Sequence, residues 1–157
     1  MRKKKIDPKK VDQRMVSYFS LIITRMVRDL EKKYGKDVRN LVKKSFIDLS
    51  LEDAENQFKN IEVKSLENFI DYLLKDINVS HEYKIIEKTP EIVKLEFTNC
   101  PYANAFRALD ASDIGEMFCL VDKPVAKLFH RDMEFKITKR IMHGDTICNH
   151  QYTMKPT

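Results

Sequence analysis

The chain has 157 residues, of which 43% are hydrophobic, so its size and composition predict a folded domain and exclude a disordered chain. It contains no run of 18 or more apolar residues, and its basic start leads into Asp7 and Pro8, so neither a transmembrane helix nor a secretory signal is expected. The whole net charge of +5 comes from the first ten residues. A basic tail without a basic face argues against nucleic-acid binding.

Cysteine usage indicates the compartment. Cys100, Cys119 and Cys148 are an odd number of cysteines with wide spacing, which is not typical of a disulfide framework. We therefore expect free thiols in a reducing environment and a cytoplasmic protein.

Residues 7–78 are predicted to be helical, because apolar residues recur there at helical spacing. Ser50 and Asp53 resemble a capping box and predict that a new helix begins at that point. The expected helices cover residues 7–35, 36–47, 50–58 and 65–77.

Residues 81–154 are predicted to form an antiparallel sheet with one inserted helix. Val93, Leu95 and Phe97 alternate with charged residues, as is typical of a strand with one buried face. The inserted helix is expected from residue 112, with a kink or end at Pro124 and a further turn or two to residue 129. The expected strands cover residues 81–88, 91–99, 133–141 and 146–154. Helices followed by strands predict an α+β fold, in a single domain of residues 1–157 with residues 1–6 as a flexible basic tail.

The last third of the chain holds the side chains with distinctive chemistry. Cys119 and Asp122 are three residues apart and share one face of the inserted helix. Cys148, His150 and Tyr152 alternate along the last strand and point to one side of the sheet. If the inserted helix packs on that side, thiols, an imidazole and a carboxylate meet in one pocket.

Two kinds of site fit these residues. A cysteine nucleophile needs a base, which a carboxylate can orient. Alternatively, Cys119, Cys148 and His150 could bind zinc or another divalent metal, although no C-x-x-C motif is present. Structural roles remain open as well: buried cysteines often only fill space, Asp122 could cap the following helix, and His150 could be a core histidine.

Several short motifs, in this order, resemble the L-2-amino-thiazoline-4-carboxylic acid hydrolase family over residues 97–152. They are C-P at residue 100, C-x-x-D at residue 119 and G-D-x-x-C-x-H at residue 144. The resemblance implies hydrolytic opening of a small ring with a C=N or C–S bond, carried out by Cys119, Asp122 and Cys148. It implies a small-molecule pocket in which Arg140 meets a substrate carboxylate; the other predicted pocket residues are Cys100, His150 and Tyr152.

A more distant similarity, carried by the G-D-x-x-C strand, is to vinyl-reductase-like small-molecule-binding domains. It predicts a sensor or binding module without catalysis, in which the same pocket holds a metal or an apolar ligand. The N-terminal helices would then form a homodimer or partner surface. Catalysis predicts a Cys119 thiol with a low pKa, whereas an inactive site predicts inert buried thiols.

Overall fold

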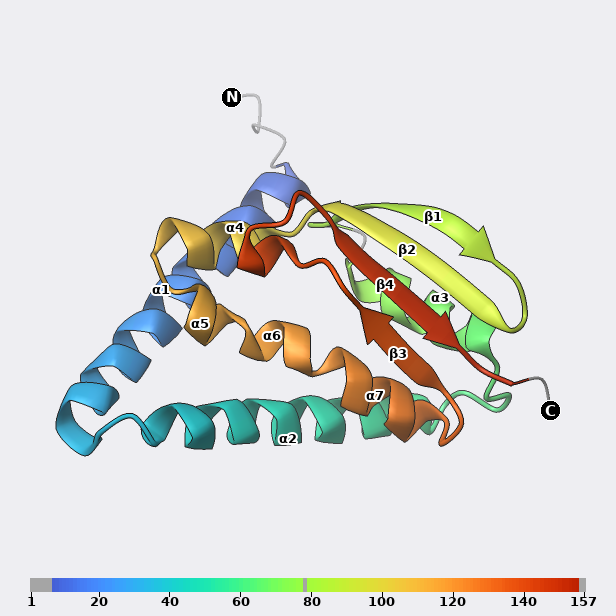
Figure 1. Cartoon of the computed structure of the whole chain (residues 1–157), viewed down its shortest axis with the longest axis horizontal. Helices are drawn as coiled ribbons and strands as arrows, with labels where there is room; N and C mark the ends of the chain where they lie inside the picture. The colour runs from blue at the N-terminus through green and yellow to red at the C-terminus, as the bar shows by residue number, and fades with distance from the viewer. Residues whose placement is uncertain (1–6, 78, 156–157) are drawn as a thin grey trace, which may run out of the picture.

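The polypeptide folds into an antiparallel sheet with helices packed against one face, as a computed structural model shows for residues 7–77 and 79–155 (Figure 1). The predicted basic tail, residues 1–6, lies outside the described residues. Helices occupy the first half of the chain, and the strands follow with further helices between them. The α+β prediction is therefore confirmed.

The first helix, α1 (Pro8–Tyr34), begins and ends as predicted. The Asp7 side chain accepts a hydrogen bond from the backbone N–H of Lys9 at 3.0 Å and so caps the helix. Gly35 ends it with a φ of 87°, a left-handed conformation that glycine adopts readily. Four mostly small residues form its buried side: Val16, Ser20, Thr24 and Val27.

The second helix, α2 (Val38–Phe58), is continuous, so the prediction of separate helices over residues 36–47 and 50–58 is wrong. The reason lies in Ser50. Its hydroxyl donates to the carbonyl oxygen of Phe46 at 2.8 Å, one turn earlier in the same helix, and does not cap a new one.

The helix α3 (Leu66–Ile77) follows the turn at Ser65 and ends the helical half. Among the described residues, no helix is both long enough and apolar enough to cross a membrane. The helical half and the sheet share one core, because the Phe69 ring lies 5.3 Å from that of Tyr152 and the Phe58 ring 4.9 Å from that of Phe129.

The predicted sheet is confirmed as four antiparallel strands in the order β1-β2-β4-β3. The last strand therefore lies between β2 and β3, with Tyr152 opposite Val93 on one side and Phe135 on the other. Val93 and Leu95 point into the core and are almost completely buried, as their alternation predicted. The strands are β1 (Glu82–Lys88), β2 (Ile92–Asn99), β3 (Glu134–Ile137) and β4 (Cys148–Thr153).

Strands β3 and β4 are shorter than the predicted 133–141 and 146–154. The Asn149 side chain oxygen accepts the backbone N–H groups of Thr138 and Lys139, at 2.9 and 2.7 Å, and so takes the place of the strand ladder there. The chain then forms a short 3-10 turn, η1 (Ile141–His143), before it returns in β4.

The inserted helical region is divided into short pieces and includes one helix that the sequence analysis missed. The missed helix, α4 (Pro101–Ala108), packs against α1. The predicted helix from residue 112 is broken before Pro124, which lies in the first turn of the last piece, where a missing N–H costs nothing. The three pieces are α5 (Ser112–Gly115), α6 (Met117–Leu120) and α7 (Asp122–Phe129).

Candidate functional site

Cys119 in α6 and Asp122 at the start of α7 are close enough to each other to interact electrostatically. Burial, and after it the charge of Asp122, raises the pKa of the Cys119 thiol to about 12. Cys100 and Cys148 contribute to the same rise. The three cysteines and the aspartate, from four different segments, therefore lie in one neighbourhood.

The pKa of Cys119 bears on its chemistry. All three cysteines are free, and burial raises the pKa of each thiol, that of Cys100 to about 11. At neutral pH the Cys119 thiol is protonated, so the expectation of a low pKa is wrong for the protein without substrate. A nucleophilic role requires the proton to leave during the attack itself.

Asp122 has the opposite property, since its pKa falls in the range that general acid–base catalysis uses. Burial raises the pKa of its carboxyl group from 3.8 to about 7, and the positive charge of Arg140 opposes the rise. Both the protonated and the ionised form of Asp122 are therefore accessible near neutral pH. The alternative role as a helix cap is wrong: Val121 occupies the cap position of α7, and no side-chain cap hydrogen bond is made there.

Arg140 brings a positive charge to this neighbourhood from the loop between β3 and β4. Its charge lowers the pKa of Asp122, Cys119 and Cys148, in each case against a larger effect of burial. Its Nε is buried and has no hydrogen-bond partner among the described residues. A buried guanidinium donor without a partner is an unsatisfied polar group, which protein interiors rarely retain without a functional reason.

The loop that carries Arg140 is held in place by backbone contacts. The Cys148 thiol accepts the backbone N–H of Ile141 at 3.1 Å. The Asp145 carboxylate accepts the backbone N–H of Arg140 at 2.7 Å, and Gly144 adopts a φ of 102° to close the turn. Cys148 and Asp145 thus position Arg140.

His150 and Tyr152 lie on the core side of β4, as the alternation predicted. The His150 ring lies 4.8 Å from that of Phe97 and 5.1 Å from that of Phe135. Burial lowers the pKa of His150 to about 3, so the imidazole is neutral at physiological pH. Its Nδ1 lies 3.4 Å from the Tyr152 hydroxyl. This environment favours the core-histidine interpretation.

Cys100 has a structural role at the start of α4. Its backbone is extended, and its sulfur accepts the N–H of Ala103 at 3.5 Å, so it caps the helix whose first residue is Pro101. The Cys-Pro pair at the end of β2 was the signal in the sequence for this helix.

The described residues contain no group of three or more histidine, cysteine, aspartate or glutamate side chains arranged to hold a metal ion. The three candidate ligands, Cys119, Cys148 and His150, are not part of such a group.

Asp122 and Tyr152 line a cavity of about 240 Å³ between the helical half and the sheet region. Most of its wall is apolar, and α2 and α3 supply much of it, which the sequence analysis missed when it found no chemistry in the helical half. Ser50 and Asp53 were the polar residues of the helical half that could have indicated a cavity there. Cys119, Cys148, Arg140 and His150 do not line this cavity. The lining residues are Ser50, Asp53, Phe69, Tyr72, Leu73, Ile77, Val121, Asp122, Val125 and Tyr152.

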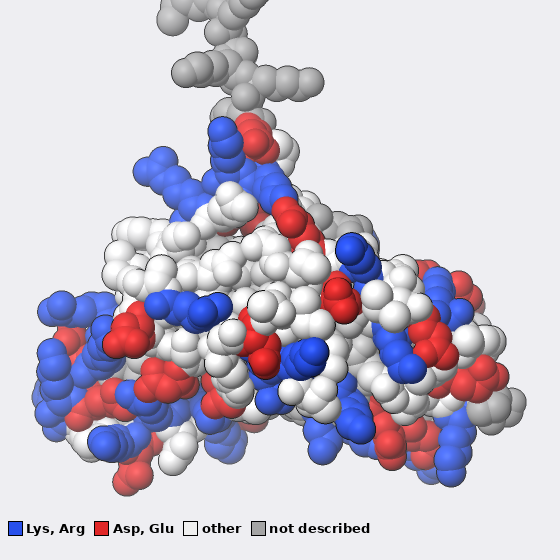
Figure 2. Space-filling model, turned by 45° about the horizontal axis from the view of Figure 1, so that its top comes forward, with Lys and Arg blue, Asp and Glu red and all other residues white. Residues whose placement is uncertain are grey.

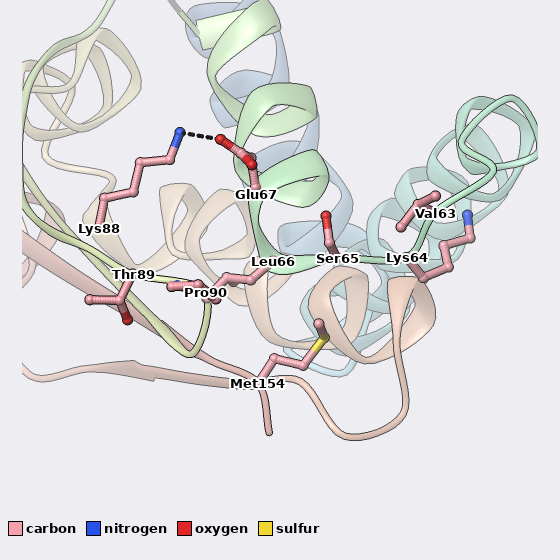
Figure 3. Close-up of a pocket in the computed structure, with 9 residues that line it drawn as sticks. All are labelled: Val63, Lys64, Ser65, Leu66, Glu67, Lys88, Thr89, Pro90 and Met154. Carbon is pink, nitrogen blue, oxygen red and sulfur yellow. Dashed lines mark ion pairs between the residues drawn. The ribbon is translucent and has the colours of Figure 1, made fainter. Parts of the chain in front are cut away.

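A larger hollow of about 510 Å³ lies between the loop before α3, the β1–β2 turn and Met154, but it holds none of the predicted site residues (Figure 3). Its polar side chains are already paired: Lys88 forms an ion pair with Glu67 at 3.1 Å, and the Lys64 amine donates to the carbonyl oxygen of Phe58 at 2.6 Å. We therefore place the candidate site at Asp122.

Comparison with known proteins gives one family. The family model for L-2-amino-thiazoline-4-carboxylic acid hydrolase matches residues 15–152. No curated protein matches. A solved structure of a trafficking protein particle complex subunit 3 from Naegleria fowleri, covalently bound to palmitic acid, is similar with a TM-score of 0.53. The two chains are 11% identical, and the match covers 94% of this chain and 97% of the other, so the likeness concerns the fold.

Proposed function

Since the chain belongs to the L-2-amino-thiazoline-4-carboxylic acid hydrolase family, we propose that it hydrolyses a small ring that contains sulfur or nitrogen and bears a carboxylate. The observation that carries the proposal is the pKa of Asp122, about 7, in a partly apolar cavity. A carboxyl group with that pKa can both accept and donate a proton near neutral pH. The cavity is smaller than the roughly 300–1,000 Å³ of sites for drug-sized ligands, which suits a small substrate.

In this proposal Cys119 is the nucleophile and Asp122 the proton carrier. Asp122 lines the cavity, whereas Cys119 does not and must turn towards it when the substrate binds. The Cys119 sulfur attacks the carbon of a ring C=N bond while its proton passes to the Asp122 carboxylate, and Asp122 returns that proton to the ring nitrogen. Water then displaces the Cys119 sulfur at the same carbon, and the sulfur recovers a proton through Asp122. The hydroxyl group on that carbon then collapses to a carbonyl, the bond from the carbon to the ring nitrogen breaks, and Asp122 transfers the hydroxyl proton to the departing nitrogen, which opens the ring.

The two pKa values decide how the first step proceeds. Moving the proton from Cys119 to Asp122 before the attack is unfavourable, because burial holds the pKa of the thiol well above that of the carboxyl group. That cost is avoided when proton transfer and carbon–sulfur bond formation are concerted. A pre-formed thiolate is therefore not part of the mechanism.

Substrate binding is assigned to Arg140 and Cys148. Arg140 offers its guanidinium group to the substrate carboxylate from beside the cavity, and Cys148, through its bond to the Ile141 N–H, holds the loop of Arg140. Tyr152 lines the cavity, His150 packs beside Tyr152, and Cys100 caps α4. Free thiols suit a reducing compartment, and we infer a cytoplasmic location.

The test follows ring opening of a thiazoline carboxylate by absorbance, with the Cys119→Ser and Asp122→Asn variants as comparison. We expect turnover by the wild type and almost none by either variant, with folding retained in the thermal melts of both. Full activity in Cys119→Ser would remove the nucleophile from the mechanism and leave Asp122 to activate water directly.

A second candidate function, a small-molecule-binding module without catalysis, is favoured by the protonated thiols and the apolar cavity wall. A protein of similar fold holds palmitic acid covalently, so a covalently held apolar ligand belongs to this alternative. Native mass spectrometry of the purified protein distinguishes the two: a retained ligand together with no turnover supports the binding module.

A further inference from the structure

The outward face of α1 is apolar where a solvated helix would be charged. Residues 15–24 contain no charged side chain, a stretch of about 15 Å along the helix. Every exposed position in that stretch except Ser17 is a large apolar or aromatic residue. Figure 2 shows a broad uncharged surface beside the charged first turn of α1. We give the name α1 face to seven exposed apolar residues in about the first five turns of α1: Val11, Met15, Tyr18, Phe19, Leu21, Ile22 and Met26.

These side chains are truly outside the core. Met15 is 62% exposed, Tyr18 61% and Leu21 49%, while the opposite side of the helix buries Ser20 and Thr24. With about 200 Å² for a complete side chain of this size, the α1 face exposes on the order of 700 Å². That is near the roughly 800 Å² that each partner contributes to a stable protein interface.

We propose that the α1 face is a homodimer interface, on which a second copy of this chain packs its own α1 about a twofold axis. A twofold axis brings the same surface of each copy together, so one apolar face satisfies itself. A face that is apolar at its centre with charges at its rim is the usual anatomy of such an interface.

The charges at the rim favour a second copy over a lipid surface. A helix that lies on a membrane keeps its lysines and arginines free for anionic lipids. Here Arg25 is paired with Asp29 at 2.7 Å, and Lys9 with Glu82 at 2.7 Å, both within the chain. The rim is thus of mixed sign, as at a protein interface.

The dimer also reaches the neighbourhood of the candidate site. The half-exposed Phe19 ring packs edge-on against Phe118 at 6.1 Å, and Phe118 stacks on Tyr102 at 4.6 Å. Phe118 directly precedes Cys119 in α6. A second copy that packs on Phe19 therefore shields from solvent the Phe19–Phe118 contact, which holds the helix that carries Cys119.

The test is sedimentation velocity of the full chain at micromolar concentration. The wild type should sediment as a species of twice the chain mass of 18.6 kDa. Leu21→Glu and Tyr18→Glu should sediment as monomers with unchanged circular dichroism, because a twofold axis buries two unpaired carboxylates and weakens association about a hundredfold. The matched control is Leu49→Glu on α2, at 63% exposure, which should remain a dimer.

Three results would overturn the proposal. One is a monomeric wild type, and the second is dissociation caused equally by Leu49→Glu. The third is a monomer that co-sediments with vesicles of phosphatidylcholine and phosphatidylserine through Leu21 and Tyr18, since lipid would then cover the face. If one charge variant fails to fold, the other decides.

Discussion

Replacement of Asp122 by asparagine should make the protein more stable and less active at the same time. Folding raises the pKa of Asp122 from 3.8 to about 7, so the folded state holds this proton more tightly than the unfolded state. Below pH 4, Asp122 is protonated in both states and leaves the free energy of unfolding unchanged. Between pH 4 and pH 7 the group increasingly lowers the free energy of unfolding, and above pH 7 this loss is constant.

The pKa of Asp122 rises by about three units on folding, which lowers the free energy of unfolding by about 4 kcal/mol at pH 8. Asparagine has nearly the same shape and no charge to bury, so Asp122→Asn should recover up to that amount. For a chain of this length the melting temperature should rise by roughly 10 °C. At pH 4, where the wild-type carboxyl group is protonated, the two proteins should melt together.

The assay is a series of thermal melts of both proteins from pH 4 to pH 9. The control is Asp132→Asn, whose side chain is 56% exposed and whose effect on the melting temperature should be small at every pH. A helix-capping Asp122 would give the opposite sign, a loss of about 1 kcal/mol on substitution. Destabilisation of Asp122→Asn at pH 8 would therefore refute the buried-carboxyl account.

Three further predictions concern the thiols and the guanidinium. Iodoacetamide should modify Cys119 slowly in the folded protein at pH 7 and rapidly after unfolding, because burial raises its pKa to about 12; fast labelling of the native chain, located by peptide mass spectrometry, would contradict this. Arg140→Lys should raise the KM for a ring carboxylate about tenfold with little change in kcat, since lysine cannot offer two parallel donors; an unchanged KM in steady-state kinetics would remove Arg140 from substrate binding. Cys100→Ala should cost about 1 kcal/mol in urea unfolding through loss of the α4 cap, while Cys100→Ser retains it.

The strands and their faces could be predicted from the sequence, because alternation is a local signal. Their alternation correctly identified Val93 and Leu95 as core residues, and β4 presents Tyr152 to the core as expected. Ser50 misled the prediction because a serine inside a helix and a serine that caps one look alike in sequence. Only the bond to the Phe46 carbonyl distinguishes them.

The grouping of Cys119, Asp122 and Cys148 could be proposed from spacing, but their environment could not. The pKa of each group is set by burial, which depends on how α6 and α7 pack on the rest of the fold. The α2 and α3 walls of the cavity were also inaccessible to sequence reasoning, since their contact with Asp122 joins residues far apart in the chain. For the same reason the sequence could not show that Cys119, Cys148 and His150 are not arranged to hold a metal ion.

The central claim is that Asp122 carries the proton in ring hydrolysis, and the pH dependence of kcat/KM for a thiazoline carboxylate tests it most directly. We expect kcat/KM of the wild type to rise with pH through an inflection near pH 7, because Asp122 must be ionised to accept the proton of Cys119. In Asp122→Asn the rate should fall at least a hundredfold and the inflection should disappear. A wild-type rate that does not change between pH 5 and pH 9, or the same inflection in Asp122→Asn, would contradict it.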